Sequence, residues 1–161
     1  MLTPGKNLPA ADVVYTPRTL AKDIIDNFNP SGVILDPCKG DGAFYDQLPE
    51  PKYWAELQEG VDFLKWTKKV DWIISNPPWS KMRVFLNHSY MIADNVVFLS
   101  TMTHFCTKAR LRDAQKYGFG LKEFYQVATP KQNWPQSGFQ LGAMHLQRGY
   151  SGPLHLTGVS G

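Results

Sequence analysis

The 161-residue sequence predicts an α/β protein in which a largely parallel sheet is covered by helices on both faces. Two observations lead to this prediction. Short apolar runs alternate along the chain with segments of helical periodicity, and two of these runs are followed by unusual loops, residues 36–44 and 76–79. Ligands of parallel sheets bind beyond the carboxyl ends of the strands. We therefore expect both loops to lie at one functional edge of the sheet.

Helices are predicted where apolar residues recur at helical spacing. The first is expected to begin at Thr16-Pro17, because Thr16 can cap a helix and Pro17 fits its first position, and to stop at Asn29-Pro30. The other predicted helices cover residues 43–48, 82–93 and 108–117. The predicted strands cover residues 33–35, 53–55, 71–74, 96–99, 124–128 and 139–146.

A single domain, residues 15–149, accounts for all of these elements. Residues 1–14 lack periodicity and contain two prolines and a glycine, so we expect an irregular N-terminal arm there. Residues 150–161 are rich in glycine and serine, which is typical of a flexible tail.

The composition, 43% hydrophobic and 19% charged, is typical of a soluble globular protein. No apolar stretch approaches the roughly 18 residues of a membrane span, and the N-terminus does not resemble a secretory signal, so we expect a cytoplasmic protein. Cys38 and Cys106 do not make a disulfide framework, and the four histidines show no ligand spacing, so no metal site is predicted. The net charge of +3 permits an anionic partner without requiring one.

The loop that follows the first predicted strand, Asp36–Phe44, has the composition of a ligand loop. Gly40 and Gly42 allow a tight turn and a close approach of the backbone to a ligand. The loop lacks the Gly-Lys-Ser/Thr ending of a P-loop, and its two carboxylates would repel a dinucleotide's pyrophosphate. Acidic side chains beside glycines instead suit a ligand with a cationic end, such as the ammonium and sulfonium groups of S-adenosylmethionine.

Acidic residues further along the chain suit the adenosine part of such a ligand. Glu56 follows the next strand and can accept hydrogen bonds from ribose hydroxyls, and Asp62-Phe63 offers an acceptor and a ring to an adenine. Two plainer interpretations remain open. Glu56 can be a solvated strand end, and Asp62 can be a helix cap.

The second loop, Asn76-Pro77-Pro78-Trp79, suits a planar amine. Two successive prolines give a stiff, extended backbone with carbonyls in fixed directions, Asn76 adds an acceptor and Trp79 adds a flat ring. Such a loop can hold a planar amine so that its nitrogen attacks a methyl group. An ordinary strand-to-turn stop with an exposed tryptophan is the alternative.

Taken in order, these motifs resemble the adenine-specific amino-methyltransferases, which act on the exocyclic 6-amino group. The match runs from about residue 14 to residue 99 and consists of Tyr15-Thr16-Pro17, the Asp-Pro-x-x-Gly-x-Gly loop, Glu56, Asp62-Phe63 and Asn76–Trp79. The resemblance implies a Rossmann-like class I methyltransferase fold, a seven-stranded mostly parallel sheet with an antiparallel last strand. It also implies S-adenosylmethionine as cofactor, S-adenosylhomocysteine as product, no metal, and adenine in DNA as target.

The same resemblance assigns roles to individual residues. The cofactor site would comprise Tyr15, Thr16, Pro17, Asp36, Pro37, Gly40, Gly42, Phe44, Glu56, Asp62, Phe63 and Asn76. The catalytic residues would be Asn76, Pro77, Pro78 and Trp79. Apart from the resemblance, side-chain charge and aromatic rings predict contacts with nucleic acid by Trp79, Lys81, Arg83, Lys108, Arg110 and Trp134, although a solvated helix face explains the basic residues after 107 equally well. Trp134 and Phe139, in the long loop beyond Lys131, can form a second wall of the base pocket, but for Phe139 we expect packing in the core instead.

Two features depart from the family pattern. Lys39 stands where a small residue is usual, and we expect it to point to solvent. Only six positions separate Glu56 from Asp62, so no helix fits between them and the core is trimmed. The larger DNA-modifying relatives carry a target-recognition domain that does not fit here, so specificity is expected to be weak or to come from loops or a partner. This compactness resembles stand-alone or phage-borne enzymes.

Other functions remain open at the level of sequence. An adenine methyltransferase acting on RNA would use the same amine chemistry. A glutamine methyltransferase acting on protein also uses an Asn-Pro-Pro loop, typically with tyrosine after the prolines and a helical N-terminal domain. A cofactor-binding regulator without activity is the third alternative. The sequence does not decide between a monomer and a homodimer.

Overall fold

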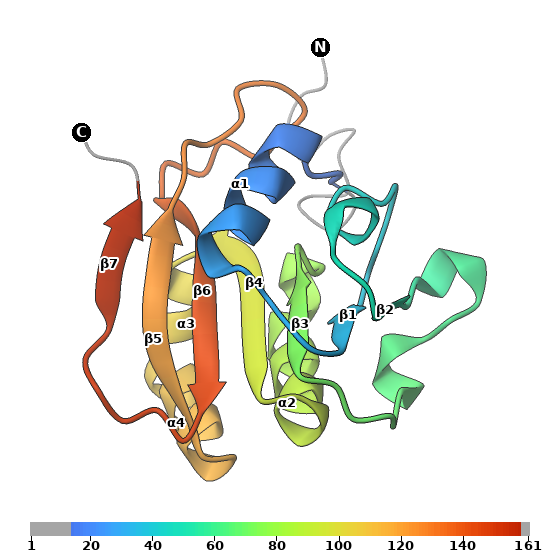
Figure 1. The fold of residues 1–161 in the computed structure, drawn as a ribbon. Coiled ribbons are helices and arrows are strands. Elements are labelled where there is room, and N and C mark those ends of the chain that lie inside the picture. Colours follow the sequence, from blue (N-terminus) through green and yellow to red (C-terminus); the bar gives the residue numbers. More distant parts are fainter. Residues whose placement is uncertain (1–13, 159–161) are drawn as a thin grey trace.

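The computed structural model describes residues 14–158, so the expected N-terminal arm lies outside the described residues except for Val14. Seven strands form one sheet in the order β2-β1-β3-β4-β6-β5-β7 (Figure 1). Their bounds are β1 Ile34–Asp36, β2 Lys52–Trp54, β3 Trp72–Ser75, β4 Asn95–Thr101, β5 Phe119–Gln126, β6 Leu141–Arg148 and β7 His155–Gly158. The neighbours from β2 to β4 are parallel, whereas β6 runs antiparallel to both β4 and β5.

The predicted fold class, a seven-stranded and mostly parallel sheet, is therefore confirmed, with one correction to its topology. The antiparallel strand is β6, whereas the last strand in the chain, β7, pairs parallel with β5. β7 lies inside the segment expected as a tail. All four of its residues are exposed, so its sequence carries no burial pattern, and pairing with the edge of β5 is what forms the strand.

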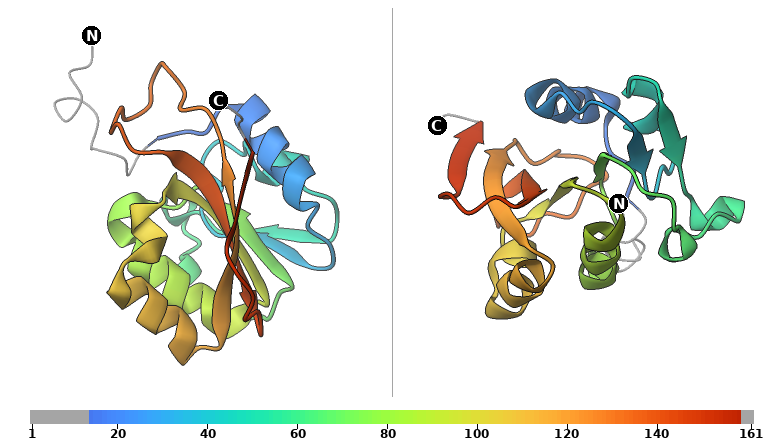
Figure 2. Two further views of the ribbon diagram at one scale, coloured as in Figure 1. Left: turned by 90° about the vertical axis from the view of Figure 1, so that its left-hand side faces the viewer. Right: turned by 60° about the horizontal axis from the view of Figure 1, so that its bottom comes forward.

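Helices cover the sheet unequally. The helix α1, Arg18–Phe28, lies on one face, and α2 (Met82–Ile92), α3 (Thr103–Cys106) and α4 (Lys108–Lys116) lie on the other (Figure 2). Each face has its own cluster of buried apolar side chains. Residues 96–99 of β4 are fully buried between the two layers, as expected of a central strand covered on both faces.

Two expected helix details differ in the structure. Pro17, not Thr16, is the residue that precedes the first turn of α1, and Thr16 is buried without making a capping hydrogen bond. Residues 43–48 form only the 3-10 turn η1, Tyr45–Gln47, because Leu48 is already extended. The residue before a proline disfavours the helical region, and Pro49 follows Leu48.

No α-helix separates β2 from β3, which agrees with the trimmed core expected from the short spacing between Glu56 and Asp62. The connection contains only the 3-10 turns η2 (Leu57–Glu59) and η3 (Phe63–Lys65). Among the described residues, no helix is long and apolar enough to cross a membrane.

Candidate active site

A pocket of about 240 Å³ lies beyond the carboxyl ends of β1, β2 and β3, where the sequence placed both special loops. Segments far apart in the chain meet there. Its lining residues are Val14, Tyr15, Cys38, Gly40, Glu56, Leu57, Gln58, Asn76, Pro78 and Lys81. A smaller adjoining recess adds Thr16, Phe44 and Ser75 to the walls. The structure thus brings together the Tyr15, Gly40, Glu56 and Asn76 motifs.

The glycine loop between β1 and η1 depends on residues without a side chain. Gly40 has φ +55°, and a Cβ on it would stand 3.2 Å from the ring of Tyr15. Gly42 has φ +91°, and its Cβ would stand 2.7 Å from the carboxylate of Asp46. Both positions therefore need glycine for conformation and for space. The loop leaves its backbone exposed to the pocket beneath the ring of Tyr15.

Glu56 holds this loop in place. Its Oε1 accepts a hydrogen bond of 2.8 Å from Gly40 N, and its Oε2 accepts one of 3.1 Å from Gln58 N. Each carboxylate oxygen can accept a second hydrogen bond, so the side chain remains able to bind hydroxyl groups in the pocket. Because two backbone N–H groups fix its orientation, Glu56 is a preorganised acceptor at the wall of the pocket.

Asp36 ends β1 and is fully buried, and it is absent from the lining of the pocket and of the adjoining recess, which both include the nearby Cys38. Its Oδ1 accepts a 3.1 Å hydrogen bond from Cys38 N, while its Oδ2 has no hydrogen-bond partner within residues 14–158. Burial raises the pKa of this carboxyl group to about 7, although the hydrogen bond from Cys38 N acts to lower it. A buried acceptor without a partner is costly, so the site suits a ligand that brings a donor or a positive charge.

The Asn-Pro-Pro-Trp loop begins where β3 ends. The indole Nε1–H of Trp79 donates to Asn76 Oδ1 at 3.1 Å and to the Leu99 carbonyl at 3.0 Å. Because an indole N–H can only donate, this contact assigns the oxygen of the Asn76 amide to the Trp79 side. The Asn76 amide nitrogen donates to Val14 O at 3.5 Å. Asn76 is therefore held from both ends at the pocket.

Aromatic side chains surround Trp79. The centroid of its ring lies 5.7 Å from the ring of His104 and 6.0 Å from the ring of Trp134, the latter edge to face at 75°. Trp134 is buried and belongs to the core cluster on the α1 side of the sheet. Burial and the nearby Arg110 lower the pKa of His104, which favours its neutral form. These neighbours and the anchored N–H fix the plane of the Trp79 ring.

Asp62 and Phe63 lie outside the lining of the pocket. Asp62 Oδ1 accepts from Leu64 N at 2.9 Å and so caps η3, which was the alternative interpretation of this residue. Phe63 is 2% exposed and packs against Phe85 and His88. Their contact with an adenine stays a prediction.

Leu57 and Gln58 occupy the wall beside Glu56 instead, and sequence reasoning missed them. Leu57 is 63% exposed, so its apolar side chain is available to pack against a flat ligand. Their place on the pocket wall could have been predicted from the sequence, because they directly follow the strand-end Glu56.

The residues assigned to nucleic acid differ in their surroundings. Lys81 is exposed at the pocket, and Lys108 is exposed at the start of α4. Arg83 is paired with Asp113 through contacts of 2.8 and 3.1 Å, so its charge is compensated. Arg110 is only partly exposed.

The expectation that Phe139 packs in the core is wrong. Phe139 is 61% exposed, and Trp134 of the same loop occupies the core instead. The chain turns at Gly138, whose φ is +80°, immediately before the exposed Phe139.

Lys39 does not project freely into solvent as expected, because its side chain is only 20% exposed and its ammonium group pairs with Glu59 at 2.8 Å over the ring of Trp54. The charge of Lys39 is therefore compensated by Glu59, although the residue also lines the recess beside the pocket. Within residues 14–158, no group of histidine, cysteine, aspartate or glutamate side chains is arranged to hold a metal ion.

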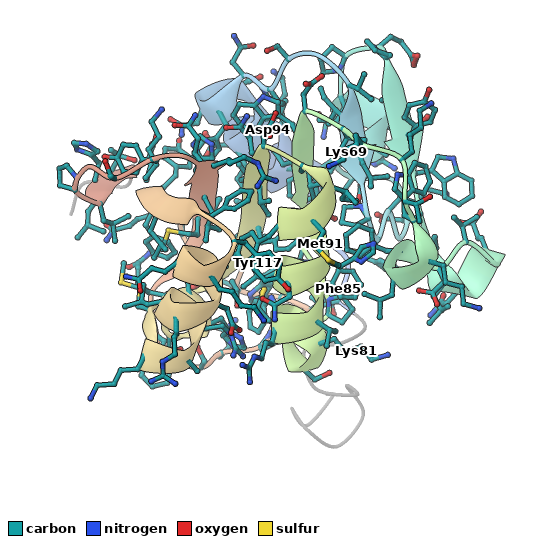
Figure 3. All side chains as sticks on the ribbon, turned by 90° about the horizontal axis from the view of Figure 1, so that it is seen from below. Lys69, Lys81, Phe85, Met91, Asp94 and Tyr117 are labelled. Carbon is teal, nitrogen blue, oxygen red and sulfur yellow. The ribbon has the colours of Figure 1, made fainter. Side chains whose placement is uncertain are left out.

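A larger hollow of about 580 Å³ lies at the opposite edge of the sheet, between residues that include Lys69, Met91, Asp94 and Tyr117 (Figure 3). Arg148 borders it and is already satisfied, because it donates to Asp94 Oδ1 at 3.0 Å, Tyr90 O at 2.7 Å and Ala93 O at 2.8 Å. These contacts tie β6 to the end of α2. This hollow is therefore a structural junction and not a second candidate for the chemistry.

No protein-family profile matches the sequence, and no curated protein matches it. Comparison with solved structures gives clear matches. A Listeria monocytogenes protein assigned as a class I S-adenosylmethionine-dependent methyltransferase superposes with a TM-score of 0.70 at 12% identity, over 96% of this chain and 69% of that protein. The chain has the class I methyltransferase fold.

Two further matches show how widely this fold is used. Magnesium protoporphyrin IX methyltransferase from Synechocystis, solved with bound S-adenosylmethionine, matches 81% of this chain and 79% of its own with a TM-score of 0.59 at 12% identity. The modification subunit of a type I restriction enzyme assigned in Vibrio vulnificus matches 91% of this chain with a TM-score of 0.63 at 15% identity. This chain spans 46% of that subunit's length.

Proposed function

We propose that this protein transfers a methyl group from S-adenosylmethionine to the 6-amino group of adenine in DNA. One observation carries the proposal. The Asn76–Trp79 loop, which suits a planar amine, borders the same pocket as the Gly40 and Glu56 walls, which suit the cofactor. A methyl donor and an amine acceptor can therefore meet there. The class I methyltransferase fold supports this assignment.

The residues around the pocket fit S-adenosylmethionine. Glu56 presents preorganised carboxylate oxygens to the ribose hydroxyls, and the Gly40 backbone under Tyr15 allows a ligand to approach closely. We assign the cationic end of the cofactor to the carboxyl group of Asp36, whose Oδ2 has no partner within residues 14–158, although Asp36 itself lines neither cavity. Leu57 offers an apolar side chain to the adenine ring. The cofactor supplies the electrophilic methyl group, and S-adenosylhomocysteine leaves.

The target amine needs acceptors, because its lone pair is delocalised into the adenine ring. In the proposed site, Asn76 Oδ1 and the Pro77 carbonyl accept hydrogen bonds from its two hydrogens. Both acceptors are held in advance, Asn76 by Trp79 and Pro77 by the stiff Pro-Pro backbone. Such preorganised groups stabilise the positive charge that develops on nitrogen as the methyl group transfers. Alignment of the amine with the methyl sulfonium supplies further acceleration.

An unpaired adenine is the form of target that suits this site best. A base within a duplex must be flipped out at a cost of a few kcal/mol, and a stacking ring such as Trp79 recovers part of that cost. Exposed Lys81 at the pocket can contact a phosphate. We therefore expect single-stranded or distorted DNA to be methylated at least as well as regular duplex.

The test measures transfer of labelled methyl groups to single-stranded DNA, duplex DNA, RNA and protein extract, followed by nucleoside analysis. Asn76→Ala should nearly abolish transfer while it changes cofactor affinity by only a few fold. Asn27→Ala on the exposed part of α1 is the matched control and should keep wild-type activity. Label found only in RNA adenine, or only in protein glutamine, would contradict the proposed target.

A further inference from the structure

We propose that the loop between β5 and β6 contains a second nucleobase subsite, which binds a base that flanks the target in single-stranded nucleic acid. The choice of nucleic acid as partner rests on the proposed function. The subsite is a cavity of about 310 Å³ that is separate from the cofactor pocket. Its walls come from both ends of the loop, Val127–Thr129 and Gln136–Gln140.

The loop lies at the correct edge of the sheet to contact the substrate. It arches over the carboxyl ends of the parallel strands, the same edge as the cofactor pocket (Figures 1 and 2). Trp134 anchors the loop at this edge, because its ring is buried and its centroid lies 6.0 Å from that of the Trp79 ring. A nucleic acid strand with its target base at Asn76–Trp79 therefore passes close to this loop.

Side-chain hydrogen bonds preorganise the cavity. The Gln136 amide nitrogen donates to Pro130 O at 2.7 Å and to Trp134 O at 3.1 Å. The Gln140 amide nitrogen donates to Val127 O at 3.0 Å and to Leu141 O at 2.8 Å. Because both hydrogens of each amide are used within the loop, the glutamines have only their carbonyl oxygens to offer to a ligand.

The chemistry of the cavity selects its ligand. Phe139 is 61% exposed and stands at the wall, so its ring can stack on a base. Carbonyl acceptors favour base edges that carry amino groups, namely those of cytosine, adenine and guanine, over thymine or uracil, whose single N3–H donor lies between two carbonyl groups. The only charged residue in 127–140 is Lys131, which is exposed and positive and so suits a phosphate backbone. The combination is typical of single-strand binding surfaces.

The experiment measures binding of fluorescent single-stranded oligonucleotides to the full chain by anisotropy, with S-adenosylhomocysteine present. An abasic site is moved one position at a time around a central adenine. We expect the affinity to fall on the order of tenfold at one flanking position, the loss typical of one base–aromatic stack. Phe139→Ala should cause a similar loss with the intact oligonucleotide. When Phe139→Ala is tested with the oligonucleotide that is abasic at the sensitive position, the affinity should fall little further than in either single change. Both changes remove the same contact.

Matched variants make the result specific. Leu156→Ala removes a side chain on β7 that is 59% exposed, close to the exposure of Phe139, and should bind like wild type. Phe139→Trp should restore binding because a ring face returns. A thymine at the sensitive position should bind several-fold more weakly than a cytosine. Wild-type affinity of Phe139→Ala, or losses that simply multiply, would overturn the subsite.

The outcome is separable from that of the proposed activity. If Phe139→Ala and the abasic site cause the same, non-additive loss of affinity but no methyl group is transferred, the subsite stands and the proposed reaction fails. If transfer to adenine is found without that non-additive loss, the reaction stands and the subsite fails. If the protein binds no oligonucleotide, the subsite is wrong whatever the activity.

Discussion

Replacement of Trp79 by phenylalanine separates two roles of this residue. Stacking on a base needs only a ring face, which phenylalanine keeps. The indole N–H, however, donates to Asn76 Oδ1 at 3.1 Å and to the Leu99 carbonyl at 3.0 Å, and phenylalanine has no N–H to replace it. An unsatisfied buried acceptor costs about 1–3 kcal/mol. Because one N–H serves both acceptors, we expect a total loss of about 2 kcal/mol, the middle of that range.

Trp79→Phe should therefore lower the unfolding free energy by about 2 kcal/mol. For a domain of this size, such a loss corresponds to a fall in melting temperature of roughly 4–8 °C. Turnover should fall about tenfold or more below wild type, since the Asn76 amide loses the donor that orients it. Circular dichroism and a methyl-transfer assay measure the two effects.

The control is Trp54→Phe, since within residues 14–158 no hydrogen bond of the Trp54 indole is seen and its ring contact with Lys39 survives in part. A Trp79→Phe protein with wild-type melting temperature and turnover would refute the positioning role.

Three further predictions concern cofactor binding, the pH dependence of stability, and the salt dependence of DNA binding. Glu56→Ala should weaken S-adenosylmethionine binding by about 1–3 kcal/mol, and unchanged affinity of the folded variant in calorimetry would refute the ribose assignment. Burial raises the Asp36 pKa from 3.8 to about 7, so the wild type should lose up to about 4 kcal/mol of stability relative to Asp36→Asn as the pH rises from about 4 to 7. Stability falls as the pH rises because, between about pH 4 and 7, the Asp36 carboxyl group is ionised in the unfolded chain but not in the folded one. If denaturant titrations from about pH 4 to 8 gave a constant difference in unfolding free energy between wild type and Asp36→Asn, the raised pKa would be contradicted. Binding and methylation of DNA should weaken as salt rises, and a flat salt titration would exclude phosphate contacts.

Strands with a buried apolar pattern, and loops with distinctive residues, were predictable from the sequence. The buried strands β1, β3 and β4 are short apolar runs. The loops after β1 and β3 were recognisable from the glycines of the first and the Asn-Pro-Pro-Trp sequence of the second. Because parallel strands end at one edge, the meeting of the Gly40, Glu56 and Asn76 motifs followed from their positions alone.

Other features depend on contacts that sequence spacing does not encode. β7 has no buried face, so only its pairing with β5 defines it. Trp134 and Phe139 lie in one loop, and their spacing does not show that Trp134 is buried while Phe139, after the turn at Gly138, is exposed. The capping role of Asp62 depends on where the chain enters η3. The hydrogen bond between Trp79 and Asn76 required the three-dimensional arrangement of the loop.

The most direct test of the central claim is to identify the methylated atom. The protein is incubated with labelled S-adenosylmethionine and a single-stranded DNA that contains adenine, and the nucleosides are then separated by mass spectrometry. Our account predicts N6-methyldeoxyadenosine with the wild type and about 100- to 1,000-fold less with Asn76→Ala. Label on another base or on protein, or an Asn76→Ala variant that keeps more than about a tenth of wild-type turnover, would contradict it.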